Sequence, residues 1–198
     1  MKKIKVRVTF TEEVLGTSSN DVAVFDKFIA SKAPDAQSKQ EEIEALGVEQ
    51  VIENGMTVFP REEGKPFIWD YQFKGFFKEA CKMLRAVKGT KSSTLKAYKD
   101  KIDGRIFPAP RKIIVNLNGV MGECQRPLRA STAQGERIAL AISETIPAGS
   151  TCEFEIKCLA DDDIELVKEW LEYGELHGML QWRNSGKGSF TTEILGIV

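Results

Sequence analysis

The chain has 198 residues, of which 42% are hydrophobic and 29% are charged, and its formal net charge is −1. This balance is typical of one soluble globular domain and excludes an intrinsically disordered chain. No stretch approaches the roughly 18 apolar residues that span a bilayer, and the basic N-terminus has no signal-peptide pattern, so we expect a cytoplasmic protein without a membrane partner.

The charge is distributed unevenly along the chain. Residues 1–60 hold 7 Lys and Arg against 10 Asp and Glu, residues 61–137 hold 17 against 8, and residues 138–198 hold 4 against 11. So basic a middle third favours a polyanion partner, although the solvated face of a lysine-rich helix gives the same counts. His177 is the only histidine and no two cysteines form a C-x-x-C pair, so we expect no metal, no cofactor and free thiols.

The first third of the chain opens with a strand. Residues Ile4–Phe10 alternate between apolar and polar, which predicts a half-buried strand. A helix is predicted at 21–30 and a second, polar and acidic, at 35–46. The second lies in a stretch, 31–60, that we interpret as a surface insertion, and a strand, a turn at Glu63–Gly64 and another strand follow.

The middle of the chain is helical and then basic. Residues 70–87 place aromatic and aliphatic side chains on one face and predict an amphipathic helix. The basic, turn-rich stretch 88–112 is interpreted as a second insertion that holds a short helix at 93–102. Strands are predicted at 112–117 and 137–143.

In the last third of the chain, apolar and polar residues alternate again. Residues 151–159 predict a half-buried strand, an amphipathic helix follows Asp161–Asp163, and a final strand covers 189–198. Helices mixed with antiparallel-type strands in this order indicate an α+β protein. The order fits a ferredoxin-like core with insertions in a single domain.

A glycine-rich loop, read as LQWRNSGKGSF, precedes the final strand. Gly186 and Gly188 allow a left-handed backbone whose N–H groups could bind an anion, Arg183 and Lys187 add charge, and Trp182 offers a stacking face. The spacing is not that of a P-loop, so nucleoside triphosphate binding is not expected. A plain structural turn remains the alternative.

Two further groups of cations are candidates for contacts with phosphate. Four lie on one stripe of the helix at 70–87: Lys74, Lys78, Lys82 and Arg85. Three stand in a segment rich in Gly, Ser and Thr: Arg126, Arg129 and Arg137. Ordinary solvated surface charge is the alternative for both groups.

Three stretches together resemble the RAMP superfamily, whose members form the backbones of CRISPR effector complexes. They are KVRVTFTEEVLGT at 5–17, FKGFFKEACKML at 73–84 and WRNSGKGSF at 182–190. The resemblance implies a modified ferredoxin-like (RRM-like) domain and an RNA ligand. It matches Arg183, Gly186, Lys187 and Gly188 to the family's loop and Lys74 to its helix-entry lysine.

The hypothesis at this point is a non-catalytic, cytoplasmic RNA-binding protein that holds the phosphate backbone in a basic groove and that can self-associate or join a protein complex. An interaction or scaffold protein of phage or defence origin is the first alternative. The second is a metal-independent endoribonuclease acting through His177, although a structural role at a helix end is the simpler interpretation of that histidine. Capping of the following helix is the simpler role of Asp161–Asp163.

Overall fold

The computed structural model describes residues 1–20, 55–132 and 135–198. The strands of its main sheet are β1 (Lys2–Phe10), β5 (Arg61–Glu62), β6 (Lys65–Trp69), β7 (Ile106–Ala109), β8 (Lys112–Asn116), β11 (Thr151–Cys158) and β12 (Phe190–Ile197). The helices are α4 (Asp70–Leu84), α5 (Tyr98–Arg105) and α6 (Asp162–Glu172), with 3₁₀ turns η1 (Lys91–Thr94), η2 (Tyr173–Glu175) and η3 (Arg183–Ser185). The helices predicted at 21–30 and 35–46, and most of the insertion predicted at 31–60, lie outside the described residues.

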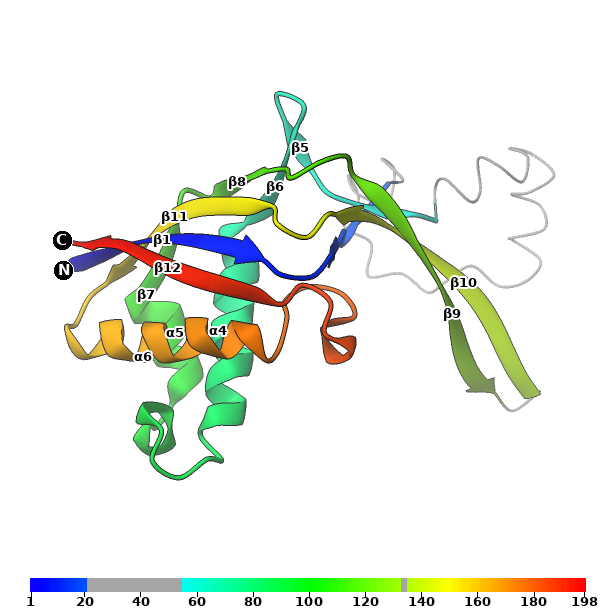
Figure 1. The fold of residues 1–198 in the computed structure, drawn as a ribbon. Coiled ribbons are helices and arrows are strands. Elements are labelled where there is room, and N and C mark those ends of the chain that lie inside the picture. The colour runs from blue at the N-terminus through cyan, green and yellow to red at the C-terminus, as the bar shows by residue number, and fades with distance from the viewer. Residues whose placement is uncertain (21–54, 133–134) are drawn as a thin grey trace.

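The main sheet has the strand order β12–β1–β11–β8–β6–β5, and β7 also pairs with β11. Strand β1 is antiparallel to both β11 and β12. When β5, β6 and α5 are set aside as additions and β7 and β8 are counted as one strand, the order along the chain is β1, α4, β7 with β8, β11, α6 and β12, which is the βαββαβ order of a ferredoxin-like domain. Figure 1 shows the helices gathered on one side of this sheet. The predicted α+β class, with an antiparallel sheet packed by helices, is confirmed.

The alternation of apolar and polar residues along β1 places its apolar face in the core. Ile4, Val6, Val8 and Phe10 are fully buried against the helices. Helix α4 packs on the sheet through Phe73, whose ring centroid lies 4.3 Å from that of Phe154 on β11. Each such aromatic side chain stabilises the fold by roughly 1.5–3 kcal/mol through its burial.

The two main helices meet above this sheet. Phe77 of α4 packs against Trp170 of α6, with their ring centroids 5.8 Å apart. The buried indole of Trp170 donates a hydrogen bond of 2.9 Å to the hydroxyl of Ser92. The predicted amphipathic helices are therefore present, and the first ends at Leu84 rather than at residue 87.

A second sheet carries a long hairpin away from the core. It consists of β2 (Val14–Leu15), β3 (Ser18–Ser19), β4 (Thr57–Val58), β9 (Gly122–Thr132) and β10 (Gly135–Ile146). We call the β9–β10 hairpin the arm, and Figure 1 shows it extending beyond the main sheet. The strand predicted at 137–143 is confirmed as part of the longer β10, whereas its partner β9 was not predicted. Both arm strands include side chains exposed to solvent, such as Pro127 and the 61% exposed Leu140, so the apolar alternation that marks a half-buried strand is weak there.

The basic stretch 88–112 holds η1, α5 and β7. Ile102 and Ile106 are buried in the core, and β7 pairs with β11, so the end of this stretch belongs to the main sheet. None of the helices in the described ranges combines the length and the apolarity that crossing a bilayer requires.

Candidate nucleic-acid interface

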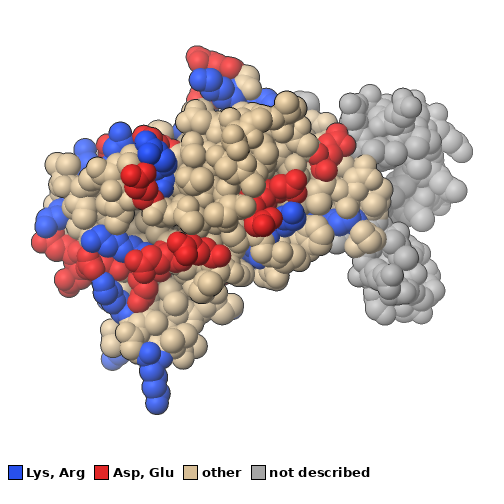
Figure 2. Space-filling view, in the orientation of Figure 1, with Lys and Arg blue, Asp and Glu red and all other residues tan. Residues whose placement is uncertain are grey.

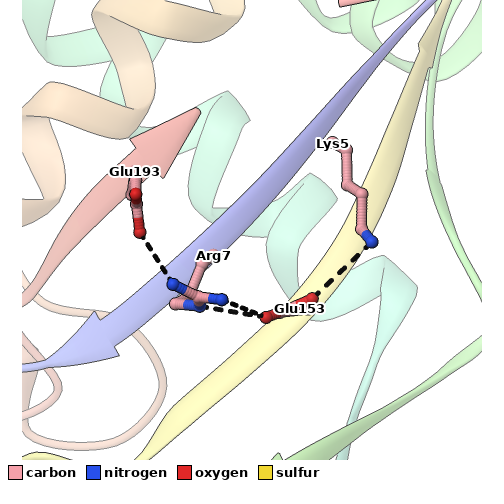
Figure 3. A network of polar contacts seen from close by, with 4 residues as sticks. All are labelled: Lys5, Arg7, Glu153 and Glu193. Atoms are coloured by element: carbon pink, nitrogen blue, oxygen red, sulfur yellow. Dashed lines mark hydrogen bonds and ion pairs between the residues drawn. The ribbon is translucent and has the colours of Figure 1, made fainter. Parts of the chain in front are cut away.

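The side of the main sheet that faces away from the helices carries charges that neutralise one another (Figure 3). The guanidinium of Arg7 donates hydrogen bonds of 2.9 and 2.8 Å to one oxygen of Glu153 and of 2.9 Å to Glu193. Lys5 lies 3.8 Å from the other oxygen of Glu153. These hydrogen bonds raise the pKa of Arg7, and those from Arg7 lower the pKa of Glu153. We call these four residues the open-face network.

Aromatic side chains are missing from the same face of β1, β11 and β12. The buried partners Val6 and Phe154 face the helices, so the register leaves Lys, Arg, Glu and Thr on the outer face. Proteins that bind single-stranded RNA on the face of a β-sheet stack the bases on aromatic residues at such positions. Figure 2 shows acidic and basic side chains intermingled over these strands. This face is therefore poorly suited to holding a polyanion.

The glycine loop has the left-handed backbone that its sequence predicts. Gly186 and Gly188 have φ values of +82° and +73°. The Gly188 N–H donates to the carbonyl of Glu13, and the Gly186 N–H donates to that of Arg183. A Cβ on Gly188 would lie 2.3 Å from the carbonyl oxygen of Met179. These two N–H groups are satisfied within the protein, so the loop is closely packed rather than open for an anion.

Both loop cations have carboxylate partners. Arg183 Nε lies 2.7 Å from an oxygen of Glu79 on α4. Lys187 Nζ lies 3.0 Å from Glu13 and 3.9 Å from Glu12, and the hydrogen bond to Glu13 raises the pKa of Lys187. A phosphate at either cation would compete with a carboxylate already in place.

The base of the arm meets the glycine loop through an arginine and a tryptophan. The guanidinium carbon of Arg126, on β9, lies 5.2 Å from the centroid of the Trp182 ring. Arg126 Nη2 donates a hydrogen bond of 2.7 Å to Gln181, whose amide nitrogen donates to the carbonyl of Gly16. The indole of Trp182 is 40% exposed, and its backbone has a φ of +56°. We call Arg126, Gln181 and Trp182 the arm root.

Arg126 differs from the loop cations because no carboxylate holds it. No ion pair joins Arg126 to any residue in the described ranges, and its Nε is buried without a hydrogen-bond partner there. A guanidinium stacked on an indole keeps its charge and most of its donors available. The arm root therefore combines a partly exposed aromatic side chain with a cation that no carboxylate among the described residues neutralises.

The four cations of the predicted stripe on α4 differ in their contacts. Lys74 donates to the backbone carbonyl of Asp103 at 3.0 Å and lies over the ring of Phe107, and burial lowers its pKa. Lys78 lies 2.7 Å from the carboxylate of Asp103. Lys82 is exposed and forms no ion pair with any described residue, and Arg85 lies over the ring of Tyr98. The N-terminal half of the stripe is thus held by α5 and β7.

The predicted site residues do not gather at one place. Successive helix residues project about 100° apart, so Lys78 and Glu79 of α4 face different neighbours: Lys78 contacts α5, and Glu79 contacts the glycine loop. Arg129 and Arg137 lie on the two arm strands, beyond Arg126, with Arg137 paired to Ala130 in the register. The described contacts bring together Arg126, Trp182 and the glycine loop, and leave the helix stripe apart.

His177 and Asp163 have polar partners within the protein, whereas Asp161, at the N-cap of α6, makes no side-chain capping hydrogen bond. His177 Nε2 lies 3.4 Å from Glu79, the carboxylate that Arg183 also contacts, and its ring stacks on Tyr173. Asp163 accepts hydrogen bonds from Arg105 and from the Ala160 N–H at the start of α6. No group of three His, Cys, Asp or Glu residues that could hold a metal ion occurs in the described ranges.

The four cysteines are free and differ in burial. Burial raises the pKa of Cys81, Cys152 and Cys158, the last to about 11. Cys124, on β9 near the arm root, is only half-buried. The pairings of Gln181, Glu13 and Glu79 with the cations of this region were not predicted, because each residue is distant in sequence from the cation that it contacts.

Comparison with known proteins supports the fold. No protein-family model and no curated protein matches the sequence. Among solved structures, a chain of "Cryo-EM structure of the Type III-B Cmr-beta bound to cognate target RNA" matches with a TM-score of 0.56 and 12% identity. The match covers 100% of this protein and 60% of that chain, so this protein spans about three fifths of its length. A chain of "Type IV-B CRISPR Complex" matches with a TM-score of 0.46 and 12% identity, covering 98% and 90%.

Proposed function

We propose that this protein binds RNA without cleaving it, as a member of the RAMP-like group, and that the arm root is its principal contact. The observation that carries the proposal is the Arg126–Trp182 pair, in which a cation without a carboxylate partner is stacked on a 40% exposed indole. Unpaired RNA bases stack on aromatic rings, and arginine binds the neighbouring phosphate.

The energetics of this contact favour single strands. Stacking of one base on an aromatic side chain contributes roughly 1–3 kcal/mol, and every base has a ring face to offer. A phosphate on Arg126 would not have to displace an acidic side chain among the described residues. Binding should therefore depend weakly on base sequence and steeply on salt.

The shared fold adds support at the level of architecture. A protein with the same fold belongs to a complex that is bound to target RNA. The remaining cations that lack acidic partners among the described residues, such as Lys82, would extend the contact with phosphate. By the same analogy we propose that the protein works within a protein complex or associates with itself along RNA.

The roles of the loop residues change under this proposal. Lys187 and Arg183 would hold the loop in place through Glu13 and Glu79, and Gly186 and Gly188 would shape it. Trp182, which this loop presents, would make the contact with RNA.

The test is binding of a fluorescein-labelled 20-nucleotide oligouridylate, measured by anisotropy between 50 and 200 mM salt. We expect affinity to fall steeply with salt, and Trp182→Ala to weaken binding by about tenfold or more. Trp182→Phe is the matched control, since it keeps a ring at the position, and should retain most of the affinity. Absence of binding to the parent protein at 50 mM salt would overturn the proposal.

Cleavage and protein partners are tested in the same preparation. RNA recovered after incubation should remain intact, and His177→Ala should bind as the parent does. RNA shortened by the parent but not by His177→Ala would instead favour an endoribonuclease. Partners that survive nuclease treatment in a pull-down, combined with no RNA binding, would favour an interaction protein.

A further inference from the structure

A second aromatic surface lies at the junction of β6 and α4. The rings of Trp69 and Tyr71 are stacked, with centroids 6.0 Å apart and planes 18° from parallel, and Phe67 meets Trp69 edge-on at 4.8 Å. Phe67 is buried, Trp69 is half-buried and Tyr71 is 56% exposed. The stack thus runs outward from the sheet and ends in an open tyrosine ring.

An arginine completes this surface. The guanidinium carbon of Arg111 lies 5.7 Å from the centroid of Trp69, and its backbone carbonyl accepts a 2.9 Å hydrogen bond from the Asp70 N–H. No side-chain hydrogen bond or ion pair joins Arg111 to any residue that the structure describes. The adjacent Lys112, by contrast, lies 2.6 Å from Glu62. We call Trp69, Tyr71 and Arg111 the ledge.

The spacing of the rings decides how a ligand could bind. A base inserted between two rings needs them about 7 Å apart, twice the 3.4 Å step of stacked bases. The 6.0 Å between Trp69 and Tyr71 is too short, so a planar ligand would add to the outer face of Tyr71. Arg111 lies over the ring of Trp69, where it could bind an anion attached to that planar group.

Hydrogen bonds connect the ledge to the arm root. Gln72 accepts from the Trp69 N–H at 2.9 Å and donates to Thr17 at 2.9 Å. The next residue back, Gly16, accepts from Gln181 of the arm root. A hollow of about 240 Å³ lies between α4 and the glycine loop, lined on the α4 side by Gln72, Gly75 and Glu79 and on the loop side by Leu180 and Arg183.

We propose that the ledge is a second binding site for an unpaired nucleotide, with the base on Tyr71 and the phosphate on Arg111, on the same RNA strand that contacts the arm root. The ligand class rests on the proposed function. The aromatic stack and the unpaired arginine support the site independently of the glycine loop.

The test uses oligouridylate that carries 5-iodouridine, photo-cross-linked to the full-length protein and followed by tryptic digestion and mass spectrometry. We expect cross-links on peptide 62–74, which contains Trp69 and Tyr71 of the ledge, and on peptide 169–183, which contains Trp182. In anisotropy measurements, Tyr71→Ala should weaken binding three- to tenfold and Tyr71→Phe should restore it. Arg111→Ala should reduce the dependence of affinity on salt.

The two proposals fail in different ways. RNA binding that is lost in Trp182→Ala but unchanged in Tyr71→Ala, with no cross-link on peptide 62–74, would overturn the ledge and leave the proposed function standing. A Tyr71→Ala variant that binds RNA normally but loses a protein partner would also overturn it, since the ledge would then be a protein surface. No RNA binding by the parent would overturn both.

Discussion

Arg7 and Arg126 both project from β-strands, yet their surroundings differ. Arg7 lies between Glu153 and Glu193 on the open face of the main sheet and donates three hydrogen bonds to them. Arg126 lies at the arm root, on an indole and a glutamine, with no acidic partner among the described residues. The guanidinium of Arg7 is thus already neutralised, and that of Arg126 is not.

The difference teaches that the number of cations in a segment does not measure its capacity to bind anions. Residues 61–137 carry a large basic excess, but Lys78 and Lys112 within it are held by Asp103 and Glu62. A bound phosphate must compete with such a carboxylate or find a cation without one.

The largest effect is expected from the glycine loop that supports the arm root. Gly188→Ala should lower the free energy of unfolding by about 3 kcal/mol, because the added Cβ meets Met179 and the backbone is left-handed. Gly186→Ala is the matched control: it has a left-handed backbone but nothing within 4 Å of a Cβ, so about 1 kcal/mol is expected. Urea denaturation measures both, and equal losses would contradict the close packing at Gly188.

The second expected effect separates the two arginines directly. Arg126→Ala should weaken binding of oligouridylate by about tenfold, the loss of roughly 1.4 kcal/mol that a charged hydrogen bond or stack contributes. Arg7→Ala should change affinity by no more than about twofold, since its charge is already balanced. Fluorescence anisotropy at one salt concentration measures both variants. If the two variants bound RNA equally well, the lack of an acidic partner would not explain which arginine contacts RNA.

A smaller effect on RNA affinity is expected when the two glutamates of the open-face network are replaced. The double variant Glu153→Gln, Glu193→Gln leaves Arg7 and Lys5 without carboxylates at the positions shown in Figure 3. We expect affinity for RNA to rise about threefold at low salt, and the slope against log salt to steepen by about 0.7, the value for one added phosphate contact on a single strand. An unchanged slope would show that freed cations on this face do not reach RNA.

The smallest effect concerns pH. Hydrogen bonds from Arg7 hold the pKa of Glu153 below its ordinary value of about 4.3. Since the folded-state pKa is the lower one, this pair stabilises the protein above about pH 4.3, and the stabilisation is lost as the pH falls through the folded-state value. In Arg7→Ala the pKa of Glu153 should rise toward the ordinary value, as carboxyl-detected NMR titration can follow. If the pKa of Glu153 did not change in this variant, a neighbour other than Arg7 would be the cause of its shift.

The sequence predicted most of the core because its signals are local. The alternation of Ile4, Val6, Val8 and Phe10, and the helical spacing of Phe73, Phe77 and Ala80, follow from burial on one face. Strand β9 of the arm was missed because none of its described side chains, at 122–127, is fully buried, and the helix at 70–87 was overextended because no glycine or proline stands at its end.

The site was less predictable because its properties depend on pairs that are far apart in sequence. The sequence identified Arg126 and Trp182 separately, but not that they would stack across 56 positions. It also gave Lys187 and Arg183 the same expected role as Arg126, since nothing local indicates that Glu13 and Glu79 would reach them. The left-handed backbone at Gly186 and Gly188, a local property, was predicted correctly.

The uneven burial of the cysteines has a practical consequence for labelling experiments. Three thiols are buried and hard to ionise, so a maleimide dye applied at neutral pH should modify Cys124 first. Cys124 stands two residues before Arg126 on β9, and positions two apart share a side of a strand. The natural chain therefore offers a single attachment point for a fluorophore beside the arm root, without engineered cysteines.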